Sequence, residues 1–453
     1  MKNLRIMKWI LLSIICLLTV DVRSQIISTF AGNGTASGVS GDGGAATAAS
    51  INAANGGAFD KYGNYYVAEV LGHKVRKITP IGIITTVAGI ATSGYNGDGM
   101  LATTAKLNSP TAIAVDTQGN IYIDDASNFR IRKMEFVTGL ISTVAGTGVS
   151  GYNGDNIPAT TAQLGGVQDL CIDKFGNLYI ADQVNYRIRK ISTDGTITTV
   201  AGSGTFSGTG TGDGGPATNA TFNWLAGIVV DTSGNLFIAD MNTARVRKVN
   251  TLGVITTIAG NGAYTYSGDN IPATNAQINP IRLAFDRSNN LVIADKFNRR
   301  ILKIDDAGII HSIAGNGISG YGGDGGPATG ASFDFPAGVV YDTCGNLYVA
   351  ESSNRRVRKI TFNPTCPSTT SINNHSISFD AVVVYPDPTT SSITLSAPYK
   401  IEEIIIRNTI GQVVYQQYYY AAKQTQEIDV SHLPAGIYFA RVNGAYTSRF
   451  VKQ

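Results

Sequence analysis

The chain has 453 residues, including 52 glycines, and only 15% of its residues are charged. This length exceeds one ordinary core and indicates two or three domains, and the composition is typical of a turn-rich all-β protein. The 35 Lys and Arg residues nearly balance the 32 Asp and Glu residues, so the charge argues against nucleic-acid binding.

A secretory signal peptide is predicted for residues 1–24. Lys2, Arg5 and Lys8 form a basic start, and an apolar run over residues 9–20 follows. A membrane-spanning helix needs roughly 20 apolar residues, so this run is short for an uncleaved anchor, which is the alternative. We expect cleavage before Gln25 and no transmembrane segment in the mature chain.

One short pattern recurs six times and defines the architecture. It is clearest at Gly176-Asn177-Leu178-Tyr179-Ile180-Ala181-Asp182, where apolar and polar residues alternate as in a strand. Its glycine position falls at Gly63, Gly119, Gly176, Gly234, Asn289 and Gly345. Such a fixed period indicates a repeat architecture.

Each repeat is predicted to form four antiparallel strands. In the third copy these are residues 166–173, 177–182, 186–191 and 196–201. Six such units predict an all-β, six-bladed β-propeller over residues 25–362. The last copy lacks a fourth strand, and we expect residues 26–31 to supply it and close the ring.

The repeats over residues 26–362 resemble the NHL-repeat family of six-bladed propellers. One departure is a long insertion between the fourth and first strands. In the last copy it reads Ser-Gly-Tyr-Gly-Gly-Asp-Gly-Gly-Pro-Ala-Thr, over residues 319–329.

A linker is predicted for residues 363–381, which are rich in Pro, Thr, Ser and Asn, and a second β domain for residues 382–453. About seven short strands, including residues 393–396, 401–407 and 412–415, indicate a small immunoglobulin-like sandwich.

The second domain resembles the type A C-terminal sorting domain of the type IX secretion system. The matching segments are Val384-Tyr385-Pro386-Asp387-Pro388, Asn408-Thr409-Ile410-Gly411-Gln412, Leu433-Pro434-Ala435-Gly436-Ile437-Tyr438 and the terminal Phe450-Val451-Lys452-Gln453. The resemblance implies export through that secretion machinery, with the product secreted or attached to the outer-membrane surface. An adhesive accessory domain is the alternative.

An acid ends the second strand of every repeat, and a basic residue follows five positions later. We interpret the pairs as a structural ring rather than a catalytic one, since one role repeats six times. The pairs are Glu69 and Lys74, Asp125 and Arg130, Asp182 and Arg187, Asp240 and Arg245, Asp295 and Arg300, and Glu351 and Arg356.

Each inserted loop carries one Asp flanked by glycines, at Asp42, Asp98, Asp155, Asp213, Asp269 and Asp324. Calcium is one possible ligand, but a single acid per loop lacks the alternating acids of a calcium loop. We favour capping of the short helical turn that follows. Four loops also carry a tyrosine that either stacks on a ligand or packs on the next loop: Tyr95, Tyr152, Tyr266 and Tyr321.

Positions that break the repeat are the best candidates for a ligand site. Asp169, with Gln168 beside it, and Arg282 replace small residues on the innermost strands, where we expect them at the channel mouth on the loop side. Plugging of the channel or a local salt bridge is the alternative. Trp224, Asp124 and His73 also depart from the repeat near this face.

Three cysteines follow the signal peptide, which allows at most one disulfide. We predict that Cys344 and Cys366 pair and that Cys171 remains a buried thiol.

The sequence favours a binding module over an enzyme. The propeller has only His73 and His311, too few for a three-histidine zinc site, and no nucleophile motif. We therefore expect no cofactor or metal and an extracellular protein, peptide or glycan ligand on the loop face. The alternatives are a channel-centred hydrolase or lyase of the lactonase-like kind, built on Asp169 and Arg282, and a purely structural surface protein.

Overall fold

The computed structural model describes residues 25–35, 40–362, 383–385, 389–408, 412–443 and 446–453. The chain divides into two compact units, residues 1–370 and 371–453. The predicted signal peptide (residues 1–24) and the predicted linker (residues 363–381) lie outside the described residues.

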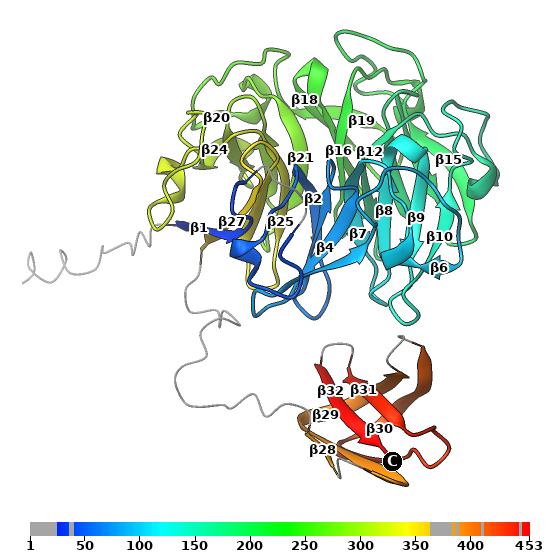
Figure 1. The fold of residues 1–453 in the computed structure, drawn as a ribbon. Helices are drawn as coiled ribbons and strands as arrows, with labels where there is room; N and C mark the ends of the chain where they lie inside the picture. Colours follow the sequence, from blue (N-terminus) through cyan, green and yellow to red (C-terminus); the bar gives the residue numbers. More distant parts are fainter. Residues whose placement is uncertain (1–24, 36–39, 363–382, 386–388, 409–411, 444–445) are drawn as a thin grey trace, which may run out of the picture. The chain divides into compact units, whose positions relative to one another are not determined.

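The first unit contains six antiparallel sheets, numbered here in chain order (Figure 1). Four strands run from the centre to the rim in sheets 1–5, and sheets 2, 3 and 5 add a two-residue strand at the rim. Sheet 1 has β2 (Ala54–Phe59), β3 (Tyr65–Glu69), β4 (Lys74–Ile78) and β5 (Ile84–Ala88). Sheet 2 has β7 (Pro110–Val115), β8 (Ile121–Asp125), β9 (Arg130–Met134), β10 (Leu140–Ala145) and β6 (Met100–Leu101).

Sheets 3 to 6 repeat this order. Sheet 3 has β12 (Val167–Ile172), β13 (Leu178–Asp182), β14 (Arg187–Ile191), β15 (Thr196–Ala201) and β11 (Ile157–Pro158). Sheet 4 has β16 (Leu225–Val230), β17 (Leu236–Asp240), β18 (Arg245–Val249) and β19 (Ile255–Ala259). Sheet 5 has β21 (Pro280–Phe285), β22 (Leu291–Asp295), β23 (Arg300–Ile304), β24 (Ile309–Ala314) and β20 (Ile271–Pro272). Sheet 6 has β25 (Pro336–Tyr341), β26 (Leu347–Glu351), β27 (Arg356–Thr361) and β1 (Ile26–Ala31).

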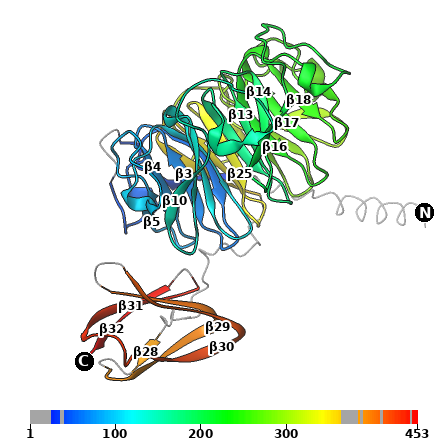
Figure 2. The same ribbon diagram turned by 90° about the vertical axis from the view of Figure 1, so that its right-hand side faces the viewer.

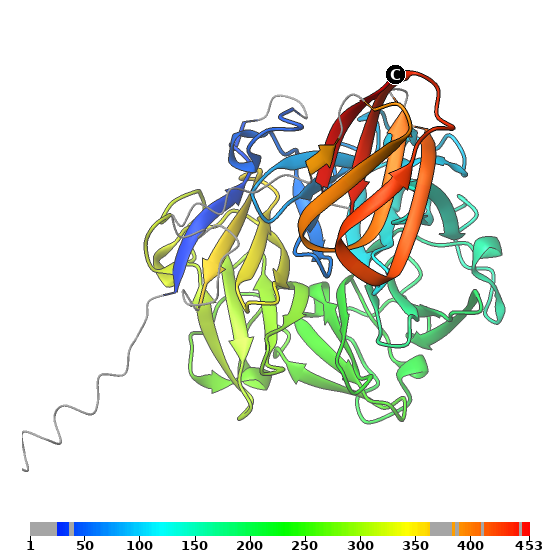
Figure 3. The same cartoon turned by 90° about the horizontal axis from the view of Figure 1, so that it is seen from below.

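The sheets follow one another in a closed ring (Figure 3). Their innermost strands contact each other in the cycle β2, β7, β12, β16, β21, β25 and back to β2. The N-terminal strand β1 pairs with β27, from Ile26 opposite Thr361 to Ala31 opposite Val357. The predicted closure by residues 26–31 is therefore confirmed.

The tight turns between first and second strands behave as their sequence predicts. Asp173 Oδ1 accepts hydrogen bonds from the backbone N–H groups of Phe175 and Asn177, each at 2.9 Å. Gly176 takes a positive φ of 87°, and Asn289 takes 63° at the equivalent place in sheet 5. The Asp–Gly spacing thus fixes these turns.

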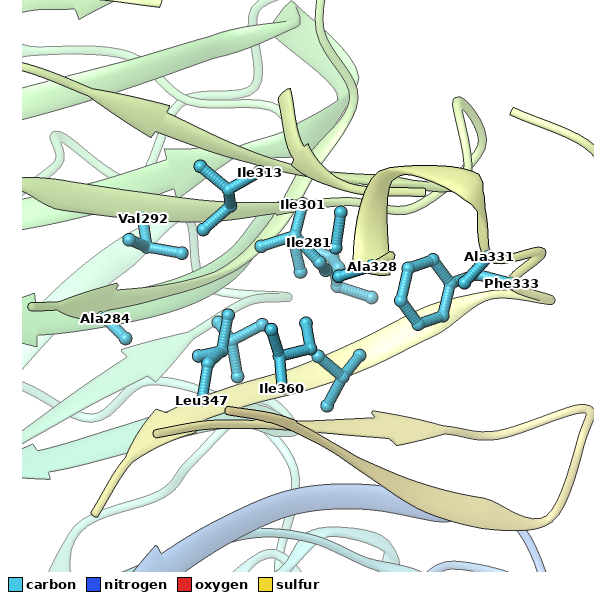
Figure 4. Close-up of a cluster of buried hydrophobic side chains, with 14 of the residues drawn as sticks. Ile281, Ala284, Val292, Ile301, Ile313, Ala328, Ala331, Phe333, Leu347 and Ile360 are labelled. Carbon is cyan, nitrogen blue, oxygen red and sulfur yellow. The ribbon is translucent and has the colours of Figure 1, made fainter. Parts of the chain in front are cut away.

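Apolar side chains fill the space between neighbouring sheets. Between sheets 5 and 6, Val292, Ile301 and Ile313 face Leu347 and Ile360 (Figure 4). All five are at most 6% exposed. Ile27 of β1 belongs to the same cluster, so the closing strand contributes to the core as well as to pairing.

Each inserted loop ends in a short 3-10 turn, and no side chain caps these turns. The predicted capping by the loop Asp is therefore wrong, because Pro, Ala or Leu occupies each N-cap. The loop turns are η2 (Ala46–Ala48), η3 (Ala102–Thr104), η5 (Ala159–Thr161), η6 (Ala217–Asn219), η8 (Ala273–Asn275) and η9 (Ala328–Gly330). Two more follow second strands: η4 (Ala126–Asn128) and η7 (Met241–Thr243).

The described residues of the second unit form fewer and longer strands than predicted (Figure 2). Its described residues form β28 (Val383–Tyr385), β29 (Ser392–Asn408), β30 (Val413–Asp429), β31 (Gly436–Val442) and β32 (Tyr446–Lys452) in one hydrogen-bonded sheet. The expected strands 393–396 and 401–407 are both parts of β29, joined across irregular register. Ile404, Ile406, Tyr438 and Phe450 lie in its own buried core.

No helix in the described parts of the chain is both long and apolar enough to cross a membrane.

Candidate functional site

The inserted loops and the turns between second and third strands lie together on one face of the ring, called the loop face here. Asn128 Nδ2 donates to Gly94 O at 2.7 Å, and Asn185 Nδ2 donates to Gly151 O at 2.6 Å. Asn354 repeats this bond with Gly320 O at 2.8 Å. The turns between first and second strands lie on the opposite face, called the turn face.

The acids that end the second strands are buried, and four of them pair with an arginine other than the predicted basic residue. Asp125 Oδ2 lies 3.4 Å from Arg132 Nη1, and Glu69 Oε1 lies 2.9 Å from Arg76 Nη1. In both cases the arginine follows the acid by seven residues, not five. The same holds for Asp182 with Arg189 and Glu351 with Arg358.

The acids pair at a spacing of seven because the arginine at that position lies deeper than the one at a spacing of five. Arg132 is fully buried in the middle of β9, and a buried guanidinium needs carboxylate partners. Arg130 lies at the strand end, half-buried, where it donates to the carbonyl groups of Asn128 and Thr147. Arg187, Arg245, Arg300 and Arg356 make equivalent bonds to backbone carbonyls.

The rim tyrosines pack on these strand-end arginines. The guanidinium carbon of Arg130 lies 4.0 Å from the ring centre of Tyr95, and that of Arg187 lies 3.9 Å from Tyr152. Tyr266 with Arg300 and Tyr321 with Arg356 repeat the contact. One ring face of each tyrosine is therefore occupied within the chain.

The loop acids complete the buried charge clusters. Asp98 Oδ1 lies 2.8 Å from Arg132 Nη2, and Asp155 Oδ1 lies 3.0 Å from Arg189 Nη2. Asp42, Asp213 and Asp324 pair with Arg76, Arg247 and Arg358 in the same way. These carboxylates neutralise a guanidinium, which disfavours the calcium interpretation. Among the described residues, no group of three His, Cys, Asp or Glu side chains could hold a metal ion.

Sheet 5 breaks the pattern, because Leu302 stands where the other sheets have the buried arginine. Asp295 accepts hydrogen bonds from Asn279 N–H at 2.7 Å and from Asn298 Nδ2. Burial raises the pKa of Asp295 to about 7. The loop acid Asp269 accepts a bond from Ser312 N–H instead of pairing with an arginine.

Arg282 lies at the centre of the ring and reaches three other sheets. Its Nη1 donates to Ala226 O of sheet 4, and its Nη2 donates to Gln168 O of sheet 3 at 2.6 Å. Thr111 O of sheet 2 lies 3.4 Å from the same Nη2. Arg282 is only 5% exposed, so the plugging alternative describes it better than a free ligand contact.

Asp169 is brought next to Arg282, as its position suggested. Its Oδ1 lies 3.5 Å from Arg282 Nε, and its Oδ2 accepts a 2.9 Å bond from Ile228 N–H. Burial raises the pKa of Asp169, and the nearby Arg282 opposes this. Asp124 belongs to the same buried group, since it accepts a hydrogen bond from Thr111 and burial raises its pKa well above the ordinary range.

A cavity of about 340 Å³ has Asp169 and Arg282 in its lining. Most of its other lining residues, including Cys171, Val229 and Ala284, follow them on the innermost strands. These strands run from the loop face to the turn face, so the cavity extends toward the turn face. We expected Asp169 and Arg282 to serve a site on the loop side, and this expectation is not met. The Arg282 side chain fills the centre of the ring and separates the cavity from the loop face.

The cysteines are partly described. Cys344 is disulfide-bonded, and Cys171 is a free, half-buried cysteine. Cys366 lies outside the described residues, so its pairing with Cys344 stays a prediction. Burial raises the pKa of the Cys171 thiol well above its ordinary range.

Two repeated positions around the loop-side mouth of the ring carry large side chains in only some sheets. A backbone bond joins the first position to the residue just before the second, as from Met241 N–H to Trp224 O. At the first position sheets 4 and 6 have Trp224 and Phe335, whereas the others have Ala, Ser, Gly or Asn. At the second, Leu71, Val184 and Phe297 are exposed by 61%, 53% and 48%. Of these residues only Trp224 was singled out from the sequence; aligning the six copies at these positions reveals the rest.

Comparison with protein families supports the two-part organisation. Residues 383–453 match the model of the secretion system C-terminal sorting domain, and residues 91–150 and 194–316 match that of the teneurin NHL domain. The chain carries an NHL domain followed by a sorting domain. Both resemblances inferred from the sequence are thereby confirmed.

Relatives share only part of their length with this chain. The NHL domain region is 32% identical over 232 residues to teneurin-3 of Danio rerio, covering 46% of this chain and 8% of that protein. It is 27% identical over 297 residues to the chloroplastic protein SUPPRESSOR OF QUENCHING 1 of Arabidopsis thaliana, covering 61% of this chain and 27% of that protein.

A solved structure resembles the NHL domain in fold. It is an auxiliary nutrient binding protein from Bacteroides thetaiotaomicron, with 19% identity and a TM-score of 0.54, covering 74% of this chain and 76% of that chain. At this identity the likeness shows a common fold alone.

Proposed function

We propose that this chain is an exported binding module, a six-bladed NHL-type propeller that takes a protein, peptide or glycan ligand on its loop face. The observation that carries the proposal is the set of large side chains at the loop-side mouth that depart from the repeat. Since Ser, Asn or Gly fills the same positions in other sheets, the fold does not require Trp224 or Phe297 there. Exposed aromatic residues of this kind commonly form binding surfaces.

The sorting domain supports the export part of the proposal. We infer a signal peptide over residues 1–24, a propeller over 25–362, a linker over 363–381 and an immunoglobulin-like sorting domain over 382–453. This domain would engage the type IX secretion machinery and leave the propeller secreted or attached to the outer-membrane surface.

A screen of the exported protein against glycan and peptide arrays tests this function. The expected result is binding that is lost when Phe297 and Val184 are replaced by Ser, the residue that sheets 2 and 6 carry at this position. Phe175→Ser is the matched control, because Phe175 is 71% exposed on the turn face. Binding that survives the loop-face changes and is lost in the control would contradict the proposal.

The cavity beside Asp169 favours one second candidate, a hydrolase or lyase acting from the turn face. A buried carboxyl whose pKa is raised is suited to general acid–base chemistry. Turnover of lactone substrates would support this candidate if Asp169→Asn abolishes it while the variant still unfolds in one cooperative transition.

A further inference from the structure

A cluster of cations and aromatic rings lies on the loop face where sheets 5 and 6 meet. It consists of Lys296, Phe297 and Arg299 from the turn after β22 and Phe335 from the segment before β25, and is called the Lys296 cluster here. The two phenylalanine rings meet edge to face, with centres 5.4 Å apart and planes at 88°. Phe297 keeps 48% of its surface exposed.

The cations of the cluster lie over these rings. Lys296 Nζ is 5.4 Å from the ring centre of Phe297 and 5.6 Å from that of Phe335. The guanidinium carbon of Arg299 is 6.0 Å from the Phe335 ring, and its Nη1 donates to Phe297 O at 3.2 Å. Two positive charges and two aromatic faces thus share one small surface.

No carboxylate neutralises these cations in the described part of the chain. The acids nearest in sequence are bound elsewhere: Asp295 by Asn279 and Asn298, and Asp334 by the Ser319 hydroxyl. The Nε–H donor of Arg299 is buried with no hydrogen-bond partner. The backbone N–H of Lys296 donates to Asn279 O at 3.0 Å.

The surroundings add further positive charge. Burial lowers the pKa of Lys296, and the Arg282 guanidinium at the centre of the ring lowers it too. The fully buried guanidinium groups described above each have a carboxylate beside them, whereas the half-buried Lys296 and Arg299 have none among the described residues. An anion bound here would give both cations a partner of opposite charge.

We propose that the Lys296 cluster binds a carboxylate carried on a six-membered ring that can stack on an aromatic side chain. The carboxylate would accept bonds from Lys296 and Arg299, while the ring lies on the exposed surface of Phe297. An aromatic acid and a uronic acid of an acidic polysaccharide share this chemistry. The inference rests on the proposed loop-face function and names the class of ligand.

Titration of the exported full-length protein with matched probes tests the inference. The carboxylate probes are 4-hydroxybenzoate and digalacturonate, and their uncharged counterparts are 4-hydroxybenzyl alcohol and digalactose. We expect at least one carboxylate to bind and its uncharged counterpart to bind far more weakly. Lys296→Met and Arg299→Gln should each weaken binding about tenfold or more, the scale of a lost charged hydrogen bond.

The chain offers a matched control in Lys174→Met. Lys174 and Phe175 form the same dipeptide with Nζ 5.2 Å from the ring centre, but on the turn face. Its affinity should stay within about twofold of the unaltered protein. Melting temperatures of all variants identify any loss caused by unfolding.

Three results of the probe titrations would overturn the inference. They are equal binding of charged and uncharged probes, binding of neither carboxylate, and binding of tetraglutamate as tight as that of the ring acids. A ligand lost with Val184→Ser but kept with Lys296→Met also overturns it, and that result leaves the proposed loop-face function standing. If no ligand binds on the loop face, both the proposed loop-face function and the carboxylate inference are wrong.

Discussion

At the scale of single residues, sheets 2, 3, 4 and 6 each have two arginines whose roles differ with their depth. Arg189 is fully buried between Asp155 and Asp182, whereas Arg187 stacks half-buried on Tyr152. Removing a buried cation leaves two carboxylates unpaired, and this costs far more than losing a surface contact.

The pair Arg189→Met and Arg187→Met tests this division in one sheet. We expect Arg189→Met to lower the free energy of unfolding by about 3–5 kcal/mol. Arg187→Met should lower it by about 1 kcal/mol, the scale of one cation–aromatic contact and exposed hydrogen bonds. Denaturant titration measures both, and the reverse order would restore the acid–arginine pairing at a spacing of five.

Asp295, the strand-ending acid of sheet 5 that lacks a buried arginine partner, predicts that stability depends on pH. Because burial raises the pKa of Asp295 to about 7, the folded chain keeps a proton there between about pH 4 and pH 7 that the unfolded chain has released. Stability therefore falls as the pH rises through this window. Asp295→Asn should reduce the fall in melting temperature between pH 5 and pH 8.

A control for this prediction is Asp305→Asn. A hydrogen bond with His311 lowers the pKa of Asp305, so its contribution has the opposite sign. This variant should not reduce the fall. An unchanged pH profile for Asp295→Asn would show that this carboxyl is ionised throughout.

At the scale of elements, the sequence predicted strands well because alternation and turn chemistry are local. The four strands of the third copy fall within about one residue of their expected ends, and Asp173 with Gly176 fixes the turn as expected. The tail shows the limit of local reasoning. The pairing of β29 with β30 contains register shifts, and these connect segments that the sequence pattern predicts as separate short strands.

The closing strand β1 gives the prediction at this scale. Ile27 and Ala31 are fully buried, and Thr29 donates a 2.6 Å hydrogen bond to Asp324 of the last inserted loop. A chain that begins at Asn33 should lose about 3 kcal/mol or more relative to one that begins at Gln25, through lost core and an unpaired sheet edge. Equal melting temperatures would contradict closure of the ring by β1.

At the scale of the whole molecule, Arg282 acts as a central tie, a side chain that links its own sheet to three others. In the sequence it is recognisable only as a departure from the repeat. The innermost strands approach so closely that a Cβ at Gly227 would lie 2.6 Å from Ile281 O. Arg282 uses the remaining central space to bind carbonyl groups of three other sheets. The layout of one repeat predicts that Arg282 lies on an innermost strand. Its hydrogen-bond partners could not be predicted in this way, because they come from other sheets and depend on the closure of the ring.

Removal of this tie should affect stability more than binding. Arg282→Met leaves Asp169 without its cation and removes the donor to three backbone carbonyl groups, at a cost of about 3–5 kcal/mol. Lys303→Met is the control, because its 3.7 Å ion pair with Asp286 is partly exposed and its loss should cost less than about 1 kcal/mol. Thermal unfolding that finds the two variants equally stable would show that Arg282 is not a tie.

Hydrogen exchange of the exported protein with and without an array-selected ligand tests the central claim most directly. The loop-face account predicts slower exchange in the turns after the second strands, around residues 183–186 and 296–299, and no change in the turns around residues 60–64 and 173–177. Protection confined to the turn face and the strands lining the Asp169 cavity would contradict binding on the loop face.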